Sequence, residues 1–70
     1  MKKAKHFSLN GELYYTHTTI TLHDLIHYFD FNDSLLVLEY NNFICEKKNW
    51  GEISIQDQDK IEIVTIVGGG

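Results

Sequence analysis

The stretch "HFSLNGELYYT", residues 6–16, predicts how the fold begins. Phe7 and Leu9 alternate with polar residues, which is typical of a strand with one buried face. Asn10-Gly11 follows at once, and this dipeptide favours a two-residue hairpin turn because both positions accept a positive φ. We therefore expect a β-hairpin over about residues 5–16.

A helix is predicted directly after this hairpin. Four apolar residues between positions 22 and 29 are spaced i, i+3, i+4 and i+7, which places them on one helical face. Thr21 precedes them and Asp24 follows three residues later, so the pair forms a variant of the capping box. We expect the helix to span about residues 22–29.

The second half of the sequence predicts short strands joined by polar turns. The expected segments are a buried strand at 35–40, a turn at Asn41-Asn42, a short return strand at 43–46, an irregular stretch with one helical turn around Trp50, a short extended piece at 53–55, a polar turn at 56–59 and a last strand at 61–67. The resulting order is β-β-α-β-β-β.

This order predicts an α+β domain in which one main helix packs across a mixed sheet of four to five strands. The first and last strands can then lie side by side as a parallel pair, with the helix in the connection between them. We expect one domain over residues 1–67, followed by a flexible glycine tail at 68–70.

Composition narrows the classes of function. The formal charge of −4 argues against a nucleic-acid binder, because phosphate binding needs clustered cations. Cys45 is the single cysteine and cannot form an internal disulfide, which indicates a reducing compartment. No run approaches the roughly 20 apolar residues of a membrane span, and residues 1–11 lack a secretory signal. We expect a cytoplasmic protein, in a bacterial cytosol or in a plastid stroma if the gene is organelle-encoded.

The sequence closes on Gly68, Gly69 and Gly70, directly after the last predicted strand. Residues without side chains can pass through a narrow channel and adopt backbone angles closed to other residues. We expect Gly68 and Gly69 to serve in recognition of the tail, and the carboxylate of Gly70 to be the reactive group. A carboxylate becomes a good acyl donor once it is joined to AMP, a step that needs ATP and Mg²⁺ on a partner enzyme.

Alternation along two strands predicts an exposed apolar patch beside the tail. Ile61 and Ile63 should face the helix, as should Leu36 and Leu38, so the residues between them face away. The opposite parity stays an alternative, because a one-residue slip exchanges the two faces of a strand. The expected partner interface comprises Leu35, Val37, Glu62, Val64 and Ile66.

Residues 7–70 resemble the ThiS family of ubiquitin-like β-grasp sulfur carriers. The similarity rests on "LLVLEYNNFI" at 35–44, "QDQDKIEIV" at 56–64 and the closing "GGG". Gln58 departs from the pattern, because a glycine is expected in the family's Asp-Gly-Asp turn.

The resemblance implies a cycle in thiamine biosynthesis. A ubiquitin-activating-type (ThiF-like) adenylyltransferase makes an acyl-adenylate at Gly70, and sulfur from a cysteine desulfurase or rhodanese-type protein converts it to a thiocarboxylate. A ThiG-like thiazole synthase then takes the sulfur. The protein would be a recycled co-substrate, not an enzyme, and would hold no stable cofactor.

Three other functions stay open at this point. The chain could serve a molybdopterin synthase, be conjugated to lysines as a protein modifier, or be an interaction module with an inert tail. Cys45 is interpreted as a small buried residue, and His23 and His27 as solvated residues without a third metal ligand.

Overall fold

The hairpin predicted from Asn10-Gly11 is the first element of the structure, a computed structural model that describes residues 3–66. Strand β1 (Lys5–Leu9) pairs antiparallel with β2 (Glu12–Thr16), and Leu9 lies opposite Glu12. Asn10 and Gly11 have φ values of 50° and 83°. Positive φ at both central positions is the type I′ geometry that matches the twist of the flanking strands.

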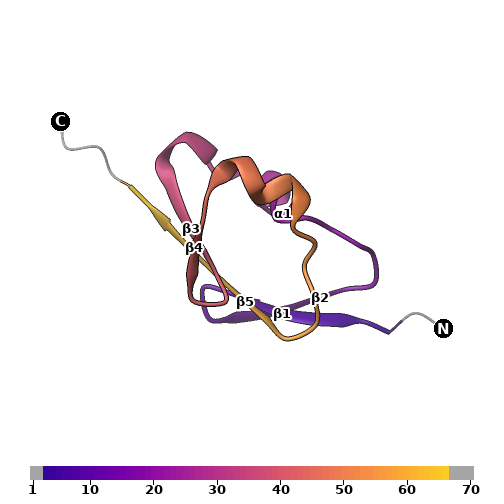
Figure 1. The fold of residues 1–70 in the computed structure, drawn as a ribbon. Helices are drawn as coiled ribbons and strands as arrows, with labels where there is room; N and C mark the ends of the chain where they lie inside the picture. Colours follow the sequence, from indigo (N-terminus) through magenta and orange to yellow (C-terminus); the bar gives the residue numbers. More distant parts are fainter. Residues whose placement is uncertain (1–2, 67–70) are drawn as a thin grey trace.

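The remaining elements follow the predicted order (Figure 1). They are the helix α1 (Leu22–Tyr28), the 3₁₀ turn η1 (Asp33–Leu35), the strands β3 (Leu36–Tyr40) and β4 (Phe43–Cys45), the 3₁₀ segment η2 (Lys47–Glu52) and the last strand β5 (Asp59–Thr65).

The strands form one mixed sheet in the order β2-β1-β5-β3-β4. The first and last strands are parallel neighbours, with Leu9 opposite Ile61, as predicted. On its other side β5 runs antiparallel to β3. The α+β prediction of a mixed sheet with one main helix is therefore confirmed, and the arrangement is that of a β-grasp fold.

Helix α1 begins with the predicted capping box. The N–H of Asp24 donates to Oγ1 of Thr21 at 3.1 Å, and the N–H of Thr21 donates to Oδ2 of Asp24 at 2.9 Å. These reciprocal bonds satisfy two backbone donors at the start of the helix. The helix ends at Tyr28, and Phe29, which the prediction included, is its C-cap.

The core lies between the sheet and a layer made by α1 and η2, which lie side by side on one face of the sheet (Figure 1). Trp50 from η2 is buried there, and its Nε1–H donates to the backbone oxygen of Cys45 at 2.9 Å. The buried apolar residues are Phe7, Leu9, Leu22, Leu25, Ile26, Leu38, Trp50, Ile55, Ile61 and Ile63.

Strand boundaries also differ from the prediction, and β4 ends at Cys45, one residue before the predicted end. Leu35 belongs to η1 and not to the strand, because Oδ1 of Asn32 accepts a hydrogen bond from the N–H of Ser34 and starts a short turn. Strand β5 begins at Asp59, two residues early, because the side chain of Asp59 is anchored to its neighbours. The predicted end of this strand at Val67, and the tail at 68–70, lie outside the described residues.

Within residues 3–66, no helix is long and apolar enough to cross a membrane.

Candidate interaction surface at the end of the last strand

Strand β5 is the last element before the glycine tail in the sequence. Its C-terminal half lies beside β3 and extends past the hairpin of β1 and β2 (Figure 1). The N–H of Ile66 donates to the backbone oxygen of Leu35 at 2.6 Å, which fixes the last described residue against the start of β3. Gly68, Gly69 and Gly70, the predicted reactive segment, lie outside the described residues.

The side chains near this end have the predicted facing. Ile61 is fully buried and Ile63 is 6% exposed, whereas Val64 and Ile66 are 57% and 52% exposed. Val37 lies directly opposite Val64 in the β3–β5 register. The alternative parity is therefore wrong, and the even-numbered side chains of β5 lie on the face of the sheet away from α1.

We call the four apolar residues at this end the tail-side patch: Leu35, Val37, Val64 and Ile66. Leu35 is 45% exposed and Val37 is half-buried. The patch joins the start of β3 to the end of β5, so the structure brings together all four apolar residues predicted for the interface. An exposed apolar cluster of this kind is typical of a protein-binding surface.

Acidic groups border the tail-side patch. Glu62, the fifth predicted residue, is half-buried and lies directly opposite Glu39 on β3. Like charges in this position repel each other. Lys60 lies on the same face and its Nζ is 3.2 Å from Oε1 of Glu62, which offsets part of that repulsion. A partner would therefore meet an apolar surface with a negatively charged border.

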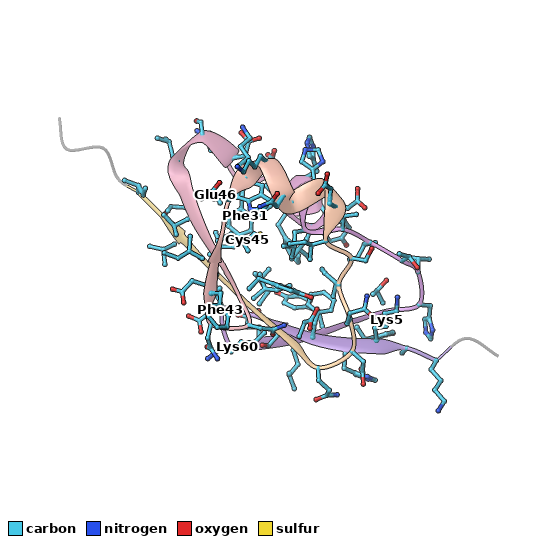
Figure 2. The ribbon with its side chains drawn as sticks, viewed as in Figure 1. Lys5, Phe31, Phe43, Cys45, Glu46 and Lys60 are labelled. Atoms are coloured by element: carbon cyan, nitrogen blue, oxygen red, sulfur yellow. The ribbon has the colours of Figure 1, made fainter. Side chains whose placement is uncertain are left out.

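The sequence interpretation missed further apolar residues on this outer face. Ile44 on β4 is 72% exposed and pairs with Glu39, and Leu13 on β2 is 84% exposed. Phe43 is also exposed, at the turn end of β4 near Lys60 (Figure 2), but it lies opposite Tyr40 and so on the other side of β4 from Ile44. The signal was present in the Asn41-Asn42 turn, because a two-residue hairpin there places Ile44 opposite Glu39 and so on the outer face.

Cys45 lies on the opposite side of β4 from Ile44, and Figure 2 shows it together with Glu46 toward η2. It is partly buried, and that burial, with a smaller effect from the charge of Glu46, raises the pKa of the thiol. A raised pKa disfavours the thiolate, the reactive form of cysteine. The packing role predicted for Cys45 is consistent with this environment.

His23 and His27 are exposed on α1, with ring centroids 4.5 Å apart. The described residues contain no group of three side chains arranged to hold a metal ion. Asp57 and Asp59 act in the turn before β5: Asp57 accepts from the N–H of His6 at 2.7 Å, and Asp59 accepts from the N–H of Gln56 at 2.7 Å. The interpretation as a turn residue is therefore confirmed for Asp57, whereas Asp59 is the first residue of β5 and closes the turn through its side chain.

Comparisons with known proteins agree with this geometry. The sequence profile of the ThiS family matches residues 7–70. The chain is 73% identical to "Uncharacterized protein ycf40" of Trieres chinensis over 67 residues, which cover 96% of this chain and 92% of that protein. It is 35% identical to "Sulfur carrier protein ThiS" of Bacillus subtilis over 63 residues, which cover 89% and 96% of the two chains.

The fold also matches a solved structure. The crystal structure of the thiamine biosynthesis protein ThiS from Geobacter metallireducens superposes with a TM-score of 0.79, covering 93% of this chain and 99% of that chain at 18% identity. This match establishes the fold, and the profile and the Bacillus subtilis relative establish the family. The chain belongs to the ThiS family of small sulfur-carrier proteins.

Proposed function

We propose that this protein carries sulfur for thiamine biosynthesis as a thiocarboxylate on Gly70. The observation that carries this proposal is the tail-side patch at the end of β5, the strand that immediately precedes the glycine segment in the sequence. Membership of the ThiS family supports the same function. In this role the patch docks the protein on an enzyme while Gly70 enters the active site of that enzyme.

The first step is activation of the carboxylate. An adenylating enzyme of the ubiquitin-activating type joins the Gly70 carboxylate to AMP and releases pyrophosphate from ATP. ATP and Mg²⁺ are bound by that enzyme, where the metal offsets phosphate charge. A carboxylate oxygen becomes part of a good leaving group in this way.

The second step is transfer of sulfur. The terminal sulfur of a protein persulfide, supplied by a cysteine desulfurase or rhodanese-type protein, attacks the acyl carbon and displaces AMP. A second thiol then cleaves the resulting acyl disulfide, so that the thiocarboxylate leaves and a disulfide forms on the donor side. Thiazole synthase consumes the thiocarboxylate sulfur and returns the carboxylate. In this cycle the protein is a recycled co-substrate, and the catalytic residues belong to its partners.

Such chemistry requires reduced thiols, which is consistent with a reducing bacterial cytosol or plastid stroma. The tail-side patch and Glu62 form the partner interface in this proposal, and Gly68 and Gly69 give the tail its narrow profile.

The test is the intact mass of the protein after incubation with ATP, Mg²⁺, a persulfide donor and the adenylating enzyme. We expect a gain equal to the replacement of one oxygen by sulfur, located at Gly70 by fragmentation. A variant without Gly69 and Gly70 should keep the fold and show no gain. An unchanged mass with an active enzyme and donor would refute the proposal.

A loaded protein then separates the two pathways. We expect thiazole synthase to consume the thiocarboxylate, and molybdopterin synthase to leave it unchanged. Consumption by the molybdopterin enzyme alone would replace the thiamine assignment while leaving the carrier chemistry in place. Conjugates to lysine side chains on a denaturing gel would instead indicate a protein modifier.

A further inference from the structure

The backbone of β5 pairs in two directions. The even-numbered residues bond toward β3: the oxygen of Lys60 accepts from the N–H of Asn41 at 2.8 Å, and the N–H of Ile66 donates to Leu35 at 2.6 Å. The odd-numbered residues point toward β1, where the oxygen of Ile61 accepts from the N–H of Asn10 at 2.9 Å. The N–H and C=O of Thr65 therefore point to the β1 side of the strand.

Strand β1 ends before it reaches Thr65. The parallel pairing stops at Leu9 opposite Ile61, and the chain turns back at Asn10-Gly11. Oδ1 of Asn10 accepts a hydrogen bond from the N–H of Ile63 at 2.7 Å. The side chain of Asn10 thus provides the acceptor that a backbone oxygen would provide if β1 were longer. Thr65 lies opposite Leu36 in the β3–β5 register, but this is a non-hydrogen-bonded pair. Among residues 3–66 no hydrogen bond involves the N–H or C=O of Thr65.

The end of β5 is thus an open strand edge next to an apolar surface. Thr65 is exposed, and its neighbours Val64 and Ile66 place apolar side chains on the outer face. An unpaired strand edge is a template for pairing with another chain. Backbone bonds at such an edge provide affinity, and the alternating side chains provide selectivity.

The length of the remaining chain restricts where a partner can lie. Four residues, 67–70, follow Ile66 in the sequence. At 3.3–3.6 Å per residue they span at most about 14 Å. An enzyme that reacts with the carboxylate of Gly70 must therefore place its active site within about 14 Å of Ile66, so its surface lies close to this end of β5.

We propose that an extended segment of the adenylating enzyme pairs with β5 at Thr65 and continues the sheet at the base of the tail. One residue of that segment exchanges two hydrogen bonds with the N–H and C=O of Thr65, and its apolar side chains contact Val64 and Ile66. This inference rests on the proposed function.

Amide hydrogen exchange of the isotope-labelled protein tests the pairing without any substitution. In the free protein we expect the N–H of Thr65 to exchange at least tenfold faster than that of Ile66, which is bonded to Leu35. On saturation with the adenylating enzyme, the exchange of the Thr65 N–H should slow at least tenfold. Slow, concentration-dependent exchange in the free protein would overturn the proposal, because a second copy of the chain would then occupy the edge.

A matched pair of variants tests the contribution to binding. Thr65→Pro removes the N–H but breaks no bond of the sheet, since proline is tolerated where the N–H is unpaired. Thr65→Val keeps the N–H and a β-branched side chain. We expect Thr65→Pro to weaken binding of the adenylating enzyme about three- to tenfold, and Thr65→Val to change it less than twofold.

The outcomes separate the two proposals. If the wild-type protein gains no sulfur, the proposed function fails. If it gains sulfur, but Thr65 stays fast in exchange in the complex and Thr65→Pro binds like wild type, the strand pairing is wrong and the carrier function stands. Should Thr65→Pro fail to fold, the exchange measurement on the wild-type protein decides alone.

Discussion

The phenol of Tyr40 donates a hydrogen bond to the carboxylate of Asp59, 19 residues later in the chain. Asp59 is the buried charged residue of the described chain, at 8% exposure. Its other oxygen accepts from Nδ2 of Asn41 at 3.0 Å, and the N–H of Gln56 donates to the carboxylate at 2.7 Å. This cluster ties the β3–β4 turn to the start of β5, and so determines where the last strand begins.

Tyr40→Phe should lower the free energy of unfolding by about 2 kcal/mol, because a buried carboxylate loses one of its donors. Urea unfolding at pH 7 measures this change. Tyr28→Phe, which removes the hydroxyl of a side chain that is 81% exposed, is the control. A loss below about 0.5 kcal/mol for Tyr40→Phe would show that the remaining donors suffice.

The same residue predicts a decline of stability in alkaline solution. Burial, the hydrogen bond to Asp59 and the charge of Asp59 raise the pKa of Tyr40 to about 12. Since the folded pKa lies above the unfolded value of about 10, this contribution to stability is complete below pH 10 and is lost as the pH rises toward 12. The pKa of Tyr14 is also raised, through its hydrogen bond to Glu12, so Tyr14 adds to the decline. The difference in alkaline stability loss between the wild type and Tyr40→Phe gives the part due to Tyr40.

Gln58→Gly should stabilise the protein by roughly 0.5–1 kcal/mol, because Gln58 has a φ of 71° and a residue with a Cβ is strained in that region. The N–H of Gln58 still donates to the oxygen of His6, so the turn keeps its backbone bond. Thermal unfolding is the measurement, with Gln58→Ala as the control that retains the Cβ. Equal midpoints for the glycine and alanine variants would contradict the strain argument.

Thr21→Ala should lower the free energy of unfolding by about 1 kcal/mol through loss of the N-cap of α1. Thr19→Ala, at an exposed position outside the helix, is the matched control and should be nearly neutral. A similar effect of both variants would indicate that the cap contributes nothing specific.

Acid should weaken the same cap. Hydrogen bonds from the backbone and side chain of Thr21 lower the pKa of Asp24. A lowered folded pKa contributes stability that is present above the ordinary aspartate pKa of about 3.9 and is lost as the pH falls below it. The free energy of unfolding, measured from pH 6 to pH 3, should therefore fall less with acid in Asp24→Asn than in the wild type. An equal fall in both proteins would show that Asp24 does not contribute to the acid dependence.

Ile63→Ala and Val64→Ala should differ sharply, although the residues are adjacent. Ile63 is buried in the core, so its truncation should cost about 2–5 kcal/mol of stability. Val64 is 57% exposed, so its truncation should cost less than about 1 kcal/mol but weaken binding of the adenylating enzyme. Titration calorimetry against that enzyme tests the second effect. Leu13→Ala, on the same face at the far edge of the sheet, should bind normally.

Much of this fold was predictable because its local signals agree with one another. Asn10-Gly11 predicted the hairpin turn, and Thr21 with Asp24 predicted the start of α1. Alternation along β5 predicted which side chains would face the helix. In each case the determining interaction joins residues that are close in the sequence, so pattern and chemistry could be read together.

The prediction was less accurate where distant residues meet. The early start of β5 depends on hydrogen bonds from Tyr40 and Asn41 to Asp59, and the sequence of the turn at 56–59 does not predict those partners. The exposed Ile44 is a different case, because its pairing with Glu39 follows from the two-residue Asn41-Asn42 hairpin, a local signal that the prediction did not use.

The sequence by itself determined the order of the elements, the cap of the helix, the inward and outward residues of β5 and the glycine segment that follows it, because these depend on local spacing and on residue chemistry. Tertiary structure alone decided that Val37 lies opposite Val64, that Asn10 bonds to Ile63, and that the edge of β5 is open at Thr65. The physical reason is that β1 is shorter than the segment of β5 beside it, a fact that emerges only when the two ends of the chain are paired.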